Sequence, residues 1–135
     1  MKRAIKFRGK RLGDGKWIYG DFIRNRGLSF IAADEIVDNP LASWQDYNVD
    51  ANTVGQFTGL YDSNCKEIYE SDIVQGLEYA DFLFGKDGNV NAVVRWSNKD
   101  AGFVFDADLT ICVALSELIS ANVQVIGNVY DKQGK

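Results

Sequence analysis

Short stretches in which apolar and polar residues alternate follow one another along most of the chain. From Lys2 to Phe7, the side chains of Arg3, Ile5 and Phe7 point to one side and those between them to the other. This is the period of a half-buried strand. Residues 16–24 are rich in aromatic and β-branched side chains and predict a second strand that pairs with the first. The same criteria predict strands at 28–32, 54–60, 66–69, 73–74, 90–96, 102–105 and 123–130.

Residues that favour turns separate these strands. Glycine adopts positive φ without steric cost, and Asp and Asn bond their own backbone. Such residues lie between the predicted strands at Gly13-Asp14-Gly15, Gly27, Asp62-Ser63-Asn64, Ser71-Asp72 and Lys86-Asp87-Gly88-Asn89. Many short strands joined at regular intervals are typical of an all-β fold. We therefore expect a small antiparallel β-barrel or sandwich, similar in size to an SH3 domain.

Three segments depart from this pattern. Residues 33–52 are the least regular, and we expect a loop there whose Trp44 and Tyr47 anchor it to the core. Residues 77–84 fit either a strand or a helical turn. Residues 115–119 predict one short helix near the C-terminus.

The length of 135 residues fits a single domain over residues 1–135, with a polar tail at 131–135. Apolar residues make up 46% of the chain, which is enough for a core without disulfides or metal. We expect neither a membrane span nor a secretory signal, because no apolar run is long enough and none follows the basic N-terminus. Cys65 and Cys112 lie in no ligand spacing, so we expect free thiols in a reducing cytoplasm.

Charge is distributed unevenly along the chain, whose formal net charge is −4. Residues 1–26 hold nine of the 15 basic residues and two of the 19 acidic ones, so this segment carries +7 and the remainder −11. Such asymmetry can mark an interaction surface. The candidates for that surface are Arg3, Lys6, Arg8, Lys10 and Arg11. In the competing interpretation, which we favour, these basic residues line the solvent face of the first strands and meet the acidic remainder of the chain within the same fold.

Residue types needed for common catalytic and metal sites are missing or badly spaced. The chain contains no histidine, which excludes histidine metal sites and nucleophiles activated by histidine. It also lacks the glycine motifs of nucleotide-binding proteins. The acids at 34–38 and 67–72 have no spacing that places two carboxylates in one pocket. Asp62 and Asn64 match a calcium loop too poorly to predict a site. We therefore expect a protein that is not an enzyme, with no catalytic residue, cofactor or metal.

Aromatic residues offer a second candidate surface. Trp17, Tyr19 and Trp96 would form a platform on which the bases of single-stranded nucleic acid stack, with the N-terminal cations along its phosphates. Aromatic residues in strands more often fill a core, and the net charge of this chain is negative. Nucleic acid is therefore the alternative partner and not the favoured one.

The segment from Val54 to Val74 carries a family resemblance. VGQFTGLYDSNCKEIYESDIV, together with IKFR near the start and VIGNVY near the end, resembles the YopX family of phage and prophage proteins over nearly the whole chain. Ser71 stands where the family pattern has glycine, so this turn either uses ordinary φ or is strained. The resemblance implies a β-rich, barrel-like fold, and it implies no activity and no catalytic residue.

Two glycines of this segment lie within predicted strand. Glycine costs stability there unless the backbone bends or another group approaches closely. We expect Gly55 and Gly59 to mark bulges at a barrel corner. A ligand groove that passes over them is the less favoured interpretation.

These observations together predict a non-enzymatic interaction module, encoded by a phage or prophage, that contacts other proteins in the cytoplasm of a bacterial host. The split in charge also suits head-to-tail self-association, because opposite patches on identical copies attract. Weak binding of single-stranded nucleic acid is the alternative function.

Overall fold

The computed structural model describes residues 4–33, 39–76, 90–106, 112–114 and 123–131. The chain divides into two compact units, residues 1–57 and 58–135, and each is described by itself. Across these described ranges the secondary structure is antiparallel strand, apart from two single-turn 3-10 helices, and no helix is long and apolar enough to cross a membrane. The single domain expected over residues 1–135 stays a prediction, because compactness does not show whether the units fold separately.

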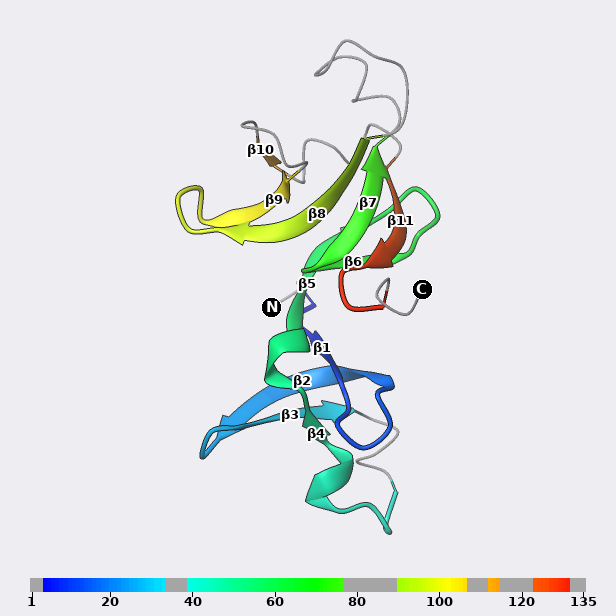
Figure 1. Cartoon of the computed structure of the whole chain (residues 1–135), viewed down its shortest axis with the longest axis vertical. Coiled ribbons are helices and arrows are strands. Elements are labelled where there is room, and N and C mark those ends of the chain that lie inside the picture. The colour runs from blue at the N-terminus through cyan, green and yellow to red at the C-terminus, as the bar shows by residue number, and fades with distance from the viewer. Residues whose placement is uncertain (1–3, 34–38, 77–89, 107–111, 115–122, 132–135) are drawn as a thin grey trace. The chain divides into compact units, whose positions relative to one another are not determined.

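The first unit is an antiparallel sheet built around one long hairpin (Figure 1). Its strands are β1 (Phe7–Lys10), β2 (Trp17–Asn25), β3 (Leu28–Ala33), β4 (Asn48–Val49) and the start of β5 (Gly55–Tyr61). They pair in the order β4-β3-β2-β1-β5. Two 3-10 helices, η1 (Trp44–Asp46) and η2 (Ala51–Thr53), flank β4. The predicted hairpin of the first two strands and the third strand are thus confirmed.

Alternation along β2 sorts its side chains onto two faces of this sheet. Ile18 faces the core, where it is buried with three other apolar residues, Ile31, Ala33 and Val49. Gly20 lies on the same side, and a Cβ at this position would collide with the backbone carbonyl of Ala32. A glycine is therefore required here so that β3 can approach β2 closely.

The second unit contains a five-stranded antiparallel sheet (Figure 1). Its strands are β7 (Asp72–Gly76), β8 (Val90–Ser97), β9 (Gly102–Asp106), β10 (Cys112–Ala114) and β11 (Val123–Asn128), in the order β10-β9-β8-β7-β11. The remainder of β5 pairs with β6 (Glu67–Tyr69). The core of this unit consists of Ile68, Val74, Ala92, Val94, Phe105 and Val123.

A buried carboxylate joins the turn after β5 to β11. Asp62 is 7% exposed, and its Oδ1 accepts hydrogen bonds from the backbone amides of Asn64 and Lys66, at 2.8 and 2.9 Å. Its Oδ2 accepts a third bond, of 2.9 Å, from the amide of Val125. The local bonds confirm the predicted turn, in which Asp62 binds its own backbone. The bond to Val125 fastens the last strand to this turn.

The predicted barrel is wrong. The described strands form two antiparallel sheets, and both sheets are open because each strand order ends at two different strands. The first strand begins at Phe7 rather than Lys2, since the pairing with β2 reaches only from Phe7 to Lys10. The short strand β10 was not expected. The helix predicted at 115–119, the ambiguous segment 77–84, the turn at 86–89 and most of the tail at 131–135 lie outside the described residues.

The backbone conformations of Ser71 and Gly59 decide between the alternatives that were predicted for the segment that resembles the YopX family. Ser71 has a φ of 75°, so its turn is the strained alternative. Gly59 has a φ of +88°, and a Cβ there would meet no other atom, which supports a backbone role over a ligand groove. The bulge predicted at Gly55 is wrong, because the pairs Phe7–Gln56 and Arg8–Gly55 continue without a shift. A bulge occurs in β11 instead, between Val125 and Gly127.

Candidate functional site

One face of β1 and β2 carries cations beside aromatic rings. Arg8 lies opposite Tyr19 and Lys10 opposite Trp17, which puts all four side chains on the same face. The guanidinium carbon of Arg8 lies 4.5 Å from the centre of the Trp17 ring, and the Nζ of Lys10 lies 5.6 Å from it. These cation–π contacts occupy the ring surface that a stacked nucleic-acid base would need.

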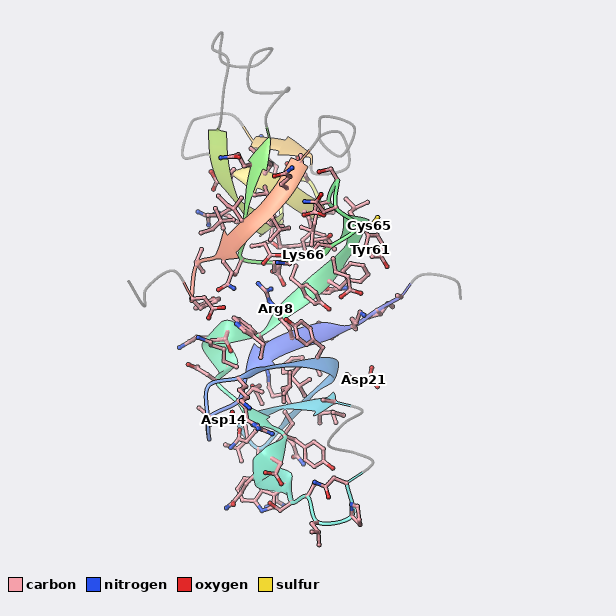
Figure 2. All side chains as sticks on the ribbon, turned by 90° about the vertical axis from the view of Figure 1, so that its right-hand side faces the viewer. Arg8, Asp14, Asp21, Tyr61, Cys65 and Lys66 are labelled. Carbon is pink, nitrogen blue, oxygen red and sulfur yellow. The ribbon has the colours of Figure 1, made fainter. Side chains whose placement is uncertain are left out.

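The five basic residues that were predicted to form an interaction surface occupy different environments. Arg3 lies outside the described residues. The Nζ of Lys6 lies 5.6 Å from the centre of the Phe57 ring, and Arg8 on β1 is 5% exposed (Figure 2). Arg8 and Lys10 lie on one face of β1, and Lys6 immediately precedes that strand. The structure thus brings three of the five together, with Arg8 largely buried.

Arg11 lies in the turn that follows β1 and has a local partner. Its Nε donates a hydrogen bond of 3.0 Å to Oδ1 of Asp14, which Figure 2 labels in the same turn. This hydrogen bond, with a second from the backbone amide of Lys16, holds the pKa of the Asp14 carboxyl well below its usual range. The charge of Arg11 is therefore neutralised locally, by an acid of the same N-terminal segment.

The three residues that were predicted to form an aromatic platform are divided between the two units. Trp17 and Tyr19 share a face of the first unit, and Tyr19 is 44% exposed. Trp96 lies in the second unit, with its ring edge-on to Phe103 at a centroid distance of 5.2 Å. Its Nε1 donates a hydrogen bond to Oδ1 of Asn98. Trp17 and Tyr19 thus form a pair, and Trp96 has its own local contacts.

An apolar hollow of about 340 Å³ lies farther along the same face of β2. Its lining comes from β2, β3 and the segment around η1, and consists of Ile23, Asn25, Phe30, Ala32, Trp44 and Tyr47. Ile23 pairs with Phe30 across the hairpin, and the Trp44 ring stands edge-on to Phe30 at 6.3 Å. Ile23 and Trp44 remain 48% and 56% exposed. The first unit thus presents large apolar side chains around a concave surface.

Two arginines lie near the tip of the hairpin, Arg24 on the face of β2 opposite the hollow and Arg26 in the turn. Asn25, which lines the hollow, lies between Arg24 and Arg26 in the chain, and both arginines are exposed. Neither forms an ion pair with any described residue. Arg26 and Gly27 have positive φ values of 55° and 79°, which form the two-residue turn that twisted hairpins favour.

This hollow was not predicted from the sequence, because Trp44 was expected to anchor its loop to the core. Tyr47 does pack against the core, as predicted, but the expectation for Trp44 is wrong, since more than half of that residue is exposed. A signal was present in β2, where Trp17, Tyr19 and Ile23 make the strand apolar on the face opposite Ile18. A strand that is apolar on both faces indicates a second contact surface.

The second unit has a hollow of about 450 Å³ beside the Ser71 turn, lined by Glu70, Ser71, Val93, Val94, Arg95, Trp96 and Val129. The turn is held on both sides, because the Ser71 amide donates to the Val94 carbonyl and the Ser71 carbonyl accepts from the Val129 amide. Arg95 pairs with Asp106 at 2.6 Å. With its cation paired and its walls of mixed polarity, this hollow is the weaker candidate.

The described part of the chain contains no cluster of side chains suited to holding a metal ion. The Asp62 carboxylate is occupied by backbone amides, and Cys65 is an exposed thiol in the turn after β5 (Figure 2). The apolar hollow of the first unit is therefore the candidate site.

Comparison with known proteins supports this fold. A model of the family described as YopX protein matches residues 6–134, which confirms the resemblance in the sequence. The fold is also similar to the crystal structure of protein EF1440 from Enterococcus faecalis. That match has a TM-score of 0.52 and 20% identity, and covers 98% of this chain and 97% of the other. No curated protein matches the chain.

Proposed function

The chain belongs to the YopX family, and from this premise we propose that it is a non-enzymatic interaction module that binds another protein through the hollow of its first unit. We further propose that it is encoded by a phage or prophage and acts in the cytoplasm of a bacterial host. The second proposal extends the family resemblance, whereas the first rests on the geometry of the hollow.

The observation that carries the proposed binding role is the group of exposed apolar side chains around the hollow. Ile23 and Trp44 are about half exposed, and full burial of such a side chain contributes roughly 1.5–3 kcal/mol. Tryptophan and tyrosine are also enriched among the residues that dominate binding energy at protein interfaces. Because each side chain is already about half buried, a protein partner that covers this face would gain roughly half of that energy for each of them.

A small-molecule ligand fits the lining less well. Such sites combine apolar walls with a few convergent polar groups that fix the orientation of the ligand. The polar side-chain groups among the described lining residues are the amide of Asn25, the hydroxyl of Tyr47 and the indole N–H of Trp44, and none of them is charged. Nucleic acid also has less support, because Arg8 and Lys10 contact the Trp17 ring from the sheet itself.

The test is affinity capture from an extract of bacterial cells, followed by titration of each purified partner against variants. We expect Ile23→Lys to weaken binding of the purified partner at least tenfold, because it places a charge in the apolar wall. Leu12→Lys is the matched control, since Leu12 is 59% exposed in the turn after β1 and does not line the hollow. A partner that binds Ile23→Lys as tightly as the unaltered protein would contradict the proposal, as would the absence of any partner.

A further inference from the structure

The edge strands of the two sheets differ in length. An edge strand presents backbone amides and carbonyls that a strand of another chain can bond, and natural proteins often keep such strands very short or charged. In the described structure β4, β6 and β10 end their sheet orders with only two or three residues each. The fourth edge strand, β11, has six residues (Figure 1). It is therefore the edge at which another strand could be added most easily.

The sequence of β11 offers no protection against such pairing. Val-Gln-Val-Ile-Gly-Asn contains no charged residue and no proline, and three of its six residues are β-branched. Short segments of this composition pair readily with copies of themselves when they are exposed on an edge. The side chain of Ile126, near the centre of the strand, is also 50% exposed. Protection of this edge has to come from another part of the fold.

The turn after β5 covers backbone groups of β11. Oδ2 of Asp62 accepts a hydrogen bond of 2.9 Å from the Val125 amide, and the Ser63 amide donates one of 2.9 Å to the Val123 carbonyl. Since these groups of β11 bond to the turn and not to β7, they face the outer edge of the sheet. Asp62 and Ser63 thus make one bond as acceptor and one as donor, as an added strand would.

The covering turn is held rigidly. The Asp62 side chain is 7% exposed, and its Oδ1 accepts bonds from the amides of Asn64 and Lys66. A bulge between Val125 and Gly127 also interrupts the regular ladder of β11, and bulges are a further means by which edges avoid pairing. The carboxylate and the bulge together make this edge a poor template for another strand.

We propose that the Asp62 turn guards the edge of β11 against a second copy of this chain. While the carboxylate bonds the Val125 amide, a foreign strand cannot use that amide. Loss of the carboxylate makes the amide accessible, and β11 of two copies then pairs antiparallel about a twofold axis, because two identical strands are complementary in that arrangement. The guard is independent of the hollow in the first unit.

Asp62→Asn tests the guard with little change in shape. Asparagine can keep its Oδ1 for the amides of Asn64 and Lys66, but it turns an NH₂ donor toward the Val125 amide, which is itself a donor. Sedimentation velocity at pH 7 over a range of protein concentrations gives the Kd of the dimer. We expect this Kd to be at least tenfold lower for Asp62→Asn than for the unaltered protein. Asp62→Ser, which keeps a turn-forming side chain that is too short to span to Val125, replaces it if circular dichroism shows that Asp62→Asn is unfolded.

Hydrogen exchange measured by NMR reports on the edge itself. In dilute Asp62→Asn the Val125 amide should exchange at least tenfold faster than in the unaltered protein, and it should regain protection as the protein concentration rises. The internal reference is the amide of Val129, which bonds the Ser71 carbonyl at 3.0 Å. A general loss of stability would accelerate both amides, whereas loss of the guard accelerates only the first.

A charge on the edge should reverse the association. Lysine is a residue that natural edge strands use against pairing, and Ile126 is exposed in the bulge. The double variant Asp62→Asn/Ile126→Lys should therefore return to the Kd of the unaltered protein. Asp62→Asn/Leu12→Lys is the matched control, since Leu12 is exposed in the first unit, and it should dimerise as Asp62→Asn does.

The other outcomes overturn the inference. An unchanged Kd, with fast Val125 exchange at every concentration, would show that Asp62 supports the fold without preventing strand addition. Equal acceleration of the Val125 and Val129 amides would indicate a general loss of stability. Dimers of Asp62→Asn that survive Ile126→Lys would place the contact away from β11. If Ile23→Lys abolished those dimers instead, the contact would be the hollow of the first unit.

Discussion

Replacement of Ser71 by glycine should stabilise the protein. Ser71 holds a φ of 75°, and a residue with a Cβ is disfavoured in this region by about 1–2 kcal/mol. The turn cannot relax easily, because its amide bonds the Val94 carbonyl at 2.8 Å and its carbonyl accepts from the Val129 amide at 3.0 Å. No hydrogen bond of the Ser71 hydroxyl to another described residue would be lost.

The expected gain is smaller than the strain that is removed. Glycine gives the unfolded chain more conformational freedom, which costs roughly 0.5–1 kcal/mol. The free energy of unfolding of Ser71→Gly should therefore exceed that of the unaltered protein by about 0.5–1 kcal/mol. For a chain of this length, this corresponds to a rise of roughly 2–4 °C in Tm.

Urea denaturation followed by circular dichroism measures this difference. Ser71→Ala is the matched control, because it removes the hydroxyl but keeps the Cβ, and its stability should stay within about 0.5 kcal/mol of the unaltered protein. A Ser71→Gly variant that is less stable than the unaltered protein would contradict a strained turn. Equal stabilisation by alanine and glycine would also contradict it, since loss of the hydroxyl would then be the cause.

Three further predictions concern stability. Burial raises the pKa of Asp62, but the amides of Val125, Lys66 and Asn64 lower it more. The stabilisation that these hydrogen bonds give to the folded protein is therefore present above the unfolded pKa of about 3.9. It is lost as pH falls from that value through the lower pKa of the folded state. Asp62→Asn should cost about 1–3 kcal/mol in urea denaturation at pH 7 and less at pH 3 than at pH 7. Gly20→Ala should lower stability by about 1–3 kcal/mol through its collision with Ala32. Gly13→Ala, where a Cβ meets nothing, should leave the Tm unchanged. Cys65→Gly should raise the Tm because Cys65 has a φ of 65°, and an equal rise in Cys65→Ser would contradict this.

Local pattern was sufficient to find most strands but not their extent. Lys2 to Phe7 alternates as a strand should, yet β1 begins at Phe7, where residues of β2 and β5 become available as partners. The prediction of a closed barrel was wrong for the same reason, because it also depends on pairing between strands. Whether edge strands meet depends on pairing between distant segments, which alternation within one segment does not encode.

The candidate site was harder to predict than the fold. The period of two correctly places Arg8 and Lys10 on one face of β1, but the sequence could not show that both cations lie against Trp17. Trp44 was assigned to the core by residue type alone, whereas η1 places it on an exposed surface. Arg24 and Arg26, which form no ion pair with a described residue, were counted in the basic segment together with Arg11, which is paired with Asp14. Burial and pairing of individual side chains depend on the tertiary structure.

The bond between Asp62 and Val125 also affects how the second unit forms during synthesis. These residues are 63 positions apart, and β11 is the last strand in chain order and a direct neighbour of β7. On the ribosome, β7 and the Asp62 turn emerge long before the strand that both require. At a synthesis rate of roughly 5–20 residues per second, this interval is several seconds. During it, the Asp62 carboxylate lacks the Val125 amide and β7 lacks the partner on one of its edges.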